Sequence, residues 1–331
     1  MKYIEDEKSI ALMKLNCLWK ADSEKTSRFK RIKNNRFVLI LYRVVKSISM
    51  IFYVGEYGVK KSLLKSYWWL NQNRINDFTL KYRDDFLKEF APVYSKNIEK
   101  KIVIYSAVFG GYDSIKEPLY VNENIDYVIF TDQEIPQDSG WQKYEITEAY
   151  GEVFYYDSYH KSKYVKIHPE KFFPDYDYSI WVDGNVLIVA DLAPFVMRLN
   201  DSSFMATFNN PCHDDIYTEA RFCVFHDAVS LEEINRQVVE YRKEGFPNHF
   251  GMREFSLIVR KHNNEKCIDL MEQWWEQLQL YTMRDQISFP YILWKNGLSI
   301  DTIENLGMNW RWNPRLHCCT HLKNHIYSDD E

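Results

Sequence analysis

An acid, a glycine and an amide stand together at the end of an apolar run, because Asp183, Gly184 and Asn185 directly follow YSIWV. Carboxylate and amide oxygens are ligands that Mg²⁺ and Mn²⁺ accept, usually together with substrate phosphates. Gly184 lets the backbone turn tightly beside a ligand. Asp-Gly and Gly-Asn pairs are also common in ordinary turns. The triplet therefore predicts a divalent-cation site only if its surroundings agree.

Basic residues and a glycine turn precede this triplet. Lys163 and Lys166 lie in a helix predicted over residues 161–172, where they either neutralise a diphosphate or form a solvated basic face. A glycine pair after the apolar run KIVIYSAVF allows a nucleotide to approach the backbone closely, or makes a plain tight turn. Asp132 follows a second apolar run, DYVIF, and either contacts the nucleoside or caps a turn. The predicted nucleotide contacts before the triplet are Ala107, Phe109, Gly111, Tyr112, Asp132, Lys163 and Lys166.

Later carboxylates offer the second half of a reaction site. Glu219 and Glu254 each lie in a loop or at the end of an element, where they bind sugar hydroxyls, accept a proton or form surface ion pairs. Arg284, Asp285 and Gln286 open a predicted helix, although an acid at a helix start is also a frequent cap.

Three histidines near the end of the chain are spaced four residues apart, at His317, His321 and His325. In a helix this spacing would place them on one face. They then form a zinc triad, supply one metal ligand, or are simply exposed to solvent.

Apolar runs alternate with helical stretches across the body of the chain, which favours an α/β sheet. Strands are expected at residues 101–109, 126–130, 178–182 and 255–260, and helices at residues 231–243 and 265–279. In open α/β sheets, ligands bind at the carboxyl ends of the strands. The glycine turn, Asp132 and Asp183 all fall at such ends, so we expect them to share one cleft.

Five motifs occur in a fixed order between about residues 101 and 295: AVFGGYD, FTD, IWVDGN, YTEA and RDQISFPY. In this order they resemble a family of GT-A glycosyltransferase-like proteins that includes the plant TOD and MUCI proteins and many bacterial polysaccharide-locus proteins. The similarity to glycogenin-like glycosyltransferases is more distant. The chain departs from their D-x-D motif, because Asn185 replaces the second acid and brings an oxygen ligand without charge.

The resemblance implies a GT-A mixed sheet, a nucleotide-sugar donor (a UDP-sugar is favoured), Mn²⁺ or Mg²⁺, and a hydroxyl acceptor. Asp183, Asn185 and a late histidine, for which we take His317, would hold the ion, and Glu219 and Arg284 would contact the acceptor sugar. Asp285 and Gln286 match a D-Q pair at the reaction centre of glycogenin-like retaining enzymes, which favours retention. In an inverting enzyme, Asp285 or Glu254 would deprotonate the acceptor.

Charge divides the chain into two parts. Residues 1–100 hold 21 Lys and Arg against 11 Asp and Glu, whereas residues 101–331 hold 21 against 36. We expect a basic helical extension over residues 1–100 and a catalytic domain over residues 101–331. The acidic body argues against nucleic acid as a partner. Six cysteines without a C-x-x-C pair are typical of reduced thiols in a cytoplasmic protein.

Residues 36–54 are apolar apart from one stripe that contains Arg36, Arg43 and Lys46. Central charges exclude a membrane-spanning helix. The segment is expected to pack on the body, to form a homodimer contact or to lie on an anionic membrane surface at the inner membrane face. The last alternative fits a lipid-linked glycan acceptor in polysaccharide biosynthesis, and it predicts that deleting residues 1–60 abolishes liposome binding without loss of donor hydrolysis.

Two other functions use the same residues. A metal-dependent phosphoesterase would need similar acids, and a non-catalytic nucleotide-sugar-binding module would tolerate Asn185 in place of an acid.

Overall fold

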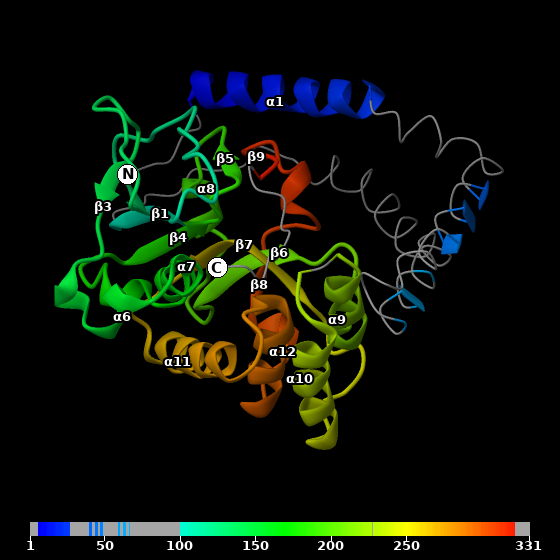
Figure 1. Cartoon of the computed structure of the whole chain (residues 1–331). Helices are drawn as coiled ribbons and strands as arrows, with labels where there is room; N and C mark the ends of the chain where they lie inside the picture. Colours follow the sequence, from blue (N-terminus) through cyan, green and yellow to red (C-terminus); the bar gives the residue numbers. More distant parts are fainter. Residues whose placement is uncertain are drawn as a thin grey trace.

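A seven-stranded sheet with flanking helices forms the centre of the protein, as a computed structural model shows (Figure 1). The structure describes residues 6–26, 100–226 and 228–321, with a few isolated positions between 40 and 66. The strand order is β3-β2-β1-β4-β7-β6-β8. The strands are β1 Ile102–Val108, β2 Asp126–Thr131, β3 Gln142–Tyr144, β4 Tyr178–Val182, β6 Met205–Asn209, β7 Arg253–Arg260 and β8 Glu304–Asn305. The predicted mixed α/β sheet is therefore confirmed.

Strand direction brings several segments to one edge of the sheet. Strand β1 pairs in parallel with β2 and β4, so the residues after these three strands meet there. Strand β7 is antiparallel to β4 and to β6, so its amino end comes to the same edge. Glu254, near the start of β7, therefore joins Asp183, which follows β4.

Alternation along β1 divides the core between the two faces of the sheet. Val103 and Tyr105 belong to a cluster that includes the apolar residues of the long helices α11 and α12. Ile102 and Ile104 belong to a second cluster, which includes residues of β5 and α8. Every residue of β1 is buried, as expected for a central strand covered on both faces.

The helices lie on both sides of this sheet. Figure 1 shows α10, α11 and α12 on one side, with α1, α8 and the β5–β9 ribbon on the other. The α-helices are α1 Glu7–Thr26, α6 Glu152–Tyr155, α7 Ser158–Ile167, α8 Ala193–Val196, α9 Ile216–Phe225, α10 Leu231–Lys243, α11 Glu265–Leu280 and α12 Asp285–Lys295. Short 3₁₀ turns are η1 Glu148–Tyr150, η2 Pro169–Lys171, η3 Ile300–Thr302 and η4 Trp310–Trp312.

Helix α7 differs from its predicted bounds because of local chemistry at both ends. Asp157 caps its first turn by accepting a hydrogen bond from His160 N at 2.8 Å. Pro169 disfavours helical backbone at His168, so the helix ends at Ile167 and a 3₁₀ turn follows. Lys163 and Lys166 remain three residues apart on the intact helix.

The last described segment of the chain contains a short strand. Strand β9, Leu316–Cys318, pairs antiparallel with β5, Val186–Ile188, and His317 lies opposite Leu187. The condition that would place the three histidines on one helical face is therefore not met, because β9 is extended where His317 lies. His325 lies outside the described residues.

Helix α1 is the main described part of the basic extension, and most of the segment 36–54 lies outside the described residues. Among the residues that the structure describes, no helix is both long and apolar enough to cross a bilayer. The division at residue 100 and the membrane-surface contact stay predictions.

Candidate active site

A cleft of about 810 Å³ opens at the edge of the sheet where β1 and β4 end. Helices α7 and α12 and the 3₁₀ turn η4 contribute to its walls. The predicted site residues that line it are Ala107, Phe109, Tyr112, Lys163, Lys166, Asp183, Gly184, Asn185, Glu219, Glu254, Arg284, Asp285 and Gln286. One cleft therefore collects carboxylates and lysines from segments more than 100 residues apart in the sequence.

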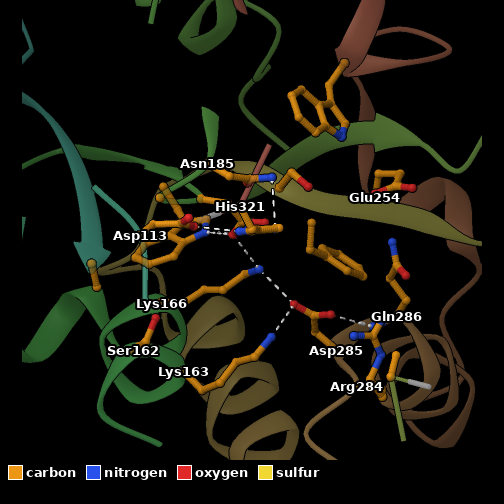
Figure 2. Close-up of a pocket in the computed structure, with 18 of the residues that line it drawn as sticks. Asp113, Ser162, Lys163, Lys166, Asn185, Glu254, Arg284, Asp285, Gln286 and His321 are labelled. Atoms are coloured by element: carbon orange, nitrogen blue, oxygen red, sulfur yellow. Dashed lines mark hydrogen bonds and ion pairs between the residues drawn. The ribbon is translucent and has the colours of Figure 1, made fainter. Parts of the chain in front are cut away.

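Two lysines of α7 converge on one carboxylate at the start of α12. Lys163 Nζ and Lys166 Nζ lie 3.0 Å and 2.7 Å from Asp285 Oδ2, and Figure 2 shows both side chains pointing toward it. Burial by itself raises the pKa of Asp285, but the charges of the two lysines outweigh it and hold that pKa well below its usual range. Asp285 is therefore ionised at neutral pH and orients both ammonium groups.

Lys166 also links Asp285 to the end of β4. Its Nζ lies 3.1 Å from Asp183 Oδ1, which also accepts a hydrogen bond from Trp181 Nε1 at 2.6 Å. Lys166 is 3% exposed, whereas Asp183 is 32% exposed. The Asp183 carboxylate is thus held by buried donors and remains partly open to the cleft. The surroundings of Asp183 agree with the sequence prediction, because it lines a cleft and forms an ion pair with a lysine.

Gly184 is needed where β4 passes the end of β1. A Cβ atom at this position would lie 2.7 Å from Val108 Cγ2 and 3.4 Å from the Ala107 carbonyl oxygen. The absence of a side chain therefore lets the Asp183 backbone approach the first strand.

His321 reaches Asn185 from the other end of the chain. Its Nδ1 lies 2.6 Å from Asp113 Oδ2, and its Nε2 lies 3.3 Å from Asn185 Nδ2. The carboxylate of Asp113 accepts from Nδ1–H, which leaves the lone pair of Nε2 facing Asn185. Figure 2 shows His321 between these two partners. This arrangement of a carboxylate behind a histidine is common at metal sites.

Glu254 has a pKa close to neutral pH, unlike the other cleft carboxylates whose pKa is shifted. It is 9% exposed, and its Oε1 lies 3.8 Å from Arg311 Nη1. Burial raises the pKa of Glu254 to about 7, against the smaller opposing effect of Arg311. A register shift in β6, between Thr207 and Phe208, occurs where Phe208 pairs with Glu254. Such irregularities often aim a side chain at a site.

Glu219 belongs to the cleft wall rather than to its open surface. It is 4% exposed, its Oε2 lies 2.5 Å from His213 Nδ1, and its Oε1 accepts from Cys223. Burial raises the pKa of Glu219, but the hydrogen bond with His213 is part of a larger opposing effect that lowers it overall. Its carboxylate is therefore engaged within the protein.

Three predicted site residues are placed elsewhere by the fold. Asp132 accepts hydrogen bonds from Gly110 N at 2.9 and 3.2 Å, which is the turn-capping alternative, and neither it nor Gly111 lines the cleft. His317 Nδ1 lies 3.0 Å from Asn16 Oδ1, and its ring stacks on Trp19. The choice of His317 as metal ligand does not fit the structure, because β9 turns His317 toward α1, whereas His321 lines the cleft.

Several cleft residues were not selected from the sequence. Asp113 belongs to the motif AVFGGYD, but its contact in the cleft is with His321, which lies 208 residues away. The cleft is also lined by Trp310, Arg311 and Trp312. Two tryptophans on either side of an arginine were the sequence feature that could have pointed to them.

A second group of metal-ligand types lies apart from the cleft lining. His168, Glu170 and Glu272 place their ligand atoms within 4.8 Å of one another. Lys171 Nζ lies 3.1 Å from Glu272 Oε1, so an ammonium group already contacts this cluster. We assign no ion to it.

Comparisons with known proteins agree with the motif order. Residues 88–309 match the family model described as "TOD1/MUCI70, glycosyltransferase-like domain". The probable hexosyltransferase MUCI70 of Arabidopsis thaliana is 28% identical over 223 residues, which are 58% of this chain and 37% of that protein. The chain thus spans little more than a third of the length of this curated relative.

Solved structures give more distant similarities. The bifunctional glycosyltransferase WbbM is 12% identical, with a TM-score of 0.41, over 64% of this chain and 39% of that one. The galactosyltransferase LgtC, solved with donor and acceptor sugar analogues, is 13% identical, with a TM-score of 0.37, over 62% of this chain and 72% of that one.

Proposed function

This chain belongs to the TOD1/MUCI70 glycosyltransferase-like domain family, and we propose that it transfers a hexose from a nucleoside-diphosphate sugar to a hydroxyl group of a glycan. One observation carries the proposal: Lys163 and Lys166 converge beside Asp183 in a single cleft at the carboxyl edge of the sheet. Ammonium groups match the charge of a diphosphate, and this edge is where α/β sheets bind ligands.

The lysine pair is oriented before any ligand arrives. Asp285 holds both ammonium groups through one oxygen atom, so the side chains need little rearrangement to meet a second anion. Preorganised charges of this kind stabilise a leaving group without a reorganisation cost. We propose that the diphosphate of the donor contacts Lys163 and Lys166 while Asp285 keeps them in place.

The oxygen and nitrogen donors near Asn185 fit a divalent cation. Asp183 offers a carboxylate, His321 a lone pair on Nε2, and Asn185 an amide oxygen once its side chain rotates. Asp113 holds His321 from behind. When bound, a divalent cation supplies positive charge that stabilises a diphosphate leaving group. Asn185 lowers the negative charge of the site relative to a second acid, so we propose a weaker site than a D-x-D motif makes.

Glu254 is the better proton acceptor of the two candidates. Asp285 is ion-paired with two lysines and its pKa is low, so it takes up a proton poorly near pH 7. Glu254 has a pKa of about 7, which suits a general base at neutral pH. We propose that Glu254 accepts the proton of the acceptor hydroxyl, and that the partly exposed Trp312 provides a flat apolar surface for its sugar ring.

The finer assignments rest on the resemblance and on the basic extension. We propose a UDP-sugar as donor and a glycan or lipid-linked glycan of a polysaccharide pathway as acceptor. Cytoplasmic location at an anionic membrane surface is part of the same proposal. The Asp285-Gln286 pair favours retention, whereas Glu254 acting as the base is the inverting alternative. The anomeric configuration of the first product distinguishes the two.

A thermal-shift panel of UDP-, GDP-, CMP- and dTDP-sugars, with and without Mn²⁺, tests the core of this proposal. UDP-sugars should raise Tm, more so with Mn²⁺, because a ligand at 100 times its Kd stabilises the folded state by about 2.7 kcal/mol. Asp183→Ala should remove the Mn²⁺-dependent part. Asp138→Ala, at an exposed position, is the matched control and should retain it.

The rival functions give different outcomes. Release of phosphate from simple esters without any nucleotide-sugar binding would indicate a phosphoesterase. Binding without transfer or donor hydrolysis would indicate a binding module. Donor hydrolysis that survives Asp183→Ala would show that the cation site has been misplaced.

A further inference from the structure

Helix α1 docks on the protein largely through polar side chains. Ser9, Met13 and Asn16 are buried at spacings of four and three residues, and Lys20 continues the same face. By contrast, the apolar Leu18 is 68% exposed. Since polar contacts are directional, this face specifies where its partner must lie rather than merely covering apolar surface.

The partner of this face is the segment that ends the described chain. Asn16 Nδ2 lies 2.9 Å from the carbonyl oxygens of both Pro314 and Leu316. Lys20 Nζ lies 2.7 Å from the Asn313 oxygen and 2.6 Å from the Leu316 oxygen. Burial lowers the pKa of Lys20 to about 8, as expected for an ammonium group that is removed from water.

A side-chain contact completes this docking. Trp19 stacks on His317 with ring centroids 3.9 Å apart, and Asn16 Oδ1 accepts from His317 Nδ1. We call Asn16, Trp19 and Lys20 the α1 latch. The latch therefore holds both the backbone and one side chain of β9, which Figure 1 places beneath α1.

Strand β9 leads directly into the candidate site. Cys319 N donates to the Asn185 oxygen at 2.9 Å, which ties the next residue to the cation triplet. Two residues later, His321 contacts Asn185 and Asp113. Strands β5 and β9 form only a two-stranded ribbon of three residues each, and such ribbons are marginal in isolation. The position of His321 therefore depends on what holds β9.

We propose that the α1 latch positions His321 for the divalent cation and the donor diphosphate, which makes the N-terminal helix a supporting part of the glycosyltransferase site. This inference rests on the proposed function, because it takes His321 as a cation ligand. The three latch residues are positioning residues and touch neither ion nor substrate. Both α1 and the segment after residue 309 lie outside the residues matched by the family model, so the latch is an addition to the matched domain.

The test measures Mn²⁺ binding by calorimetry in the presence of UDP, on the full chain. Lys20→Met should weaken the apparent Kd for Mn²⁺ about 10-fold, the low end of the loss when a direct hydrogen-bond partner of a metal ligand is removed, because Lys20 acts on His321 only through β9. Lys14→Met, on an exposed position of the same helix, is the matched control and should change nothing. Lys20→Arg keeps the positive charge and should restore most of the affinity.

A double variant separates positioning from general stability. If the latch acts through His321, Lys20→Met should weaken Mn²⁺ binding no further in a His321→Ala background. Trp19→Ala, at a half-exposed position, gives a second variant should Lys20→Met fail to fold, and it should weaken Mn²⁺ binding several-fold. Loss of Tm with unchanged Mn²⁺ affinity, or additive effects in the double variant, would overturn the latch alone. No Mn²⁺-dependent UDP binding by the wild-type chain would overturn the proposed function together with it.

Discussion

At the residue scale, two carboxylates of one cleft are tuned in opposite directions by their neighbours. Asp285 faces two ammonium groups, whereas Glu254 is buried with one arginine at 3.8 Å. The first therefore stays ionised and the second titrates near pH 7. Pairs of acids separated in this way often divide structural and proton-transfer roles.

Glu254→Gln tests the proton-transfer role. Transfer by the wild-type enzyme should rise with pH through about 7, because only the ionised Glu254 accepts a proton. The variant should lose about 10²- to 10⁴-fold in kcat and should lose this limb of the pH profile. Rates measured from pH 5.5 to 8.5 with saturating donor check both. A variant that keeps the wild-type profile would rule out Glu254 as the base.

The stability of Glu254→Gln at high pH is a control for misfolding. The variant should be no less stable than the wild type there, so misfolding would not explain its lost activity. The folded-state pKa of Glu254 lies above its ordinary value of 4.5, so the folded state binds the proton more tightly than the unfolded state. This contribution is present below pH 4.5 and is lost as pH rises through about 7. Between pH 5 and pH 8 the wild-type protein should therefore lose roughly 1–3 kcal/mol of unfolding free energy that Glu254→Gln does not lose. Urea unfolding at the two pH values measures this difference.

At the element scale, the site depends on close contact between the ends of β1 and β4. The apolar runs predicted strands β1, β2 and β4 nearly residue for residue, because buried parallel strands consist of continuous β-branched residues. The antiparallel insertion of β7 between β4 and β6 was not predicted, since strand order depends on long-range pairing. That insertion brings Glu254 to the cleft.

Gly184→Ala should disturb this contact. Its new Cβ would lie 2.7 Å from Val108 Cγ2, so β1 and the segment after β4 must separate. We expect a loss of about 1–3 kcal/mol in the free energy of unfolding, with weaker UDP binding. Adding Val108→Ala removes the crowded methyl group and should restore UDP affinity, measured by calorimetry. Failure of this rescue would show that crowding is not the cause.

At the scale of the whole molecule, the first described helix and the last described strand form one unit. Asn16 bonds to Leu316 across 300 residues of sequence. The latch alters the expectation for a deletion of residues 1–60, because it predicts impaired donor hydrolysis when α1 is removed. A test of membrane binding must therefore leave α1 intact.

Replacing Arg36, Arg43 and Lys46 by Ser meets this requirement. Each basic residue near an anionic surface contributes about 1 kcal/mol to binding. The affinity for phosphatidylserine liposomes, measured by sedimentation, should therefore fall roughly 100-fold. Hydrolysis of a UDP-sugar should stay unchanged, since α1 is untouched. Triple replacement of Lys81, Arg83 and Lys88 provides a control of equal charge. Unchanged liposome binding in the first variant would contradict the membrane-surface prediction.

The sequence by itself identified the residues at the β4 end and most of the charged side chains that line the cleft. An apolar strand followed by Asp183, Gly184 and Asn185 is a local pattern, and the carboxyl ends of parallel strands must share an edge. The ordered motifs also predicted the glycosyltransferase family, which the match over residues 88–309 confirms.

Only the tertiary structure decided which histidine reaches the cleft and which segment lies behind it. His317 and His321 are equivalent by spacing, but the pairing of β9 with β5 turns one toward α1 and carries the other to Asn185. Asp113 likewise gained its role from a residue 208 positions away. Side-chain direction and long-range pairing arise from the packing of distant segments, which local patterns do not encode.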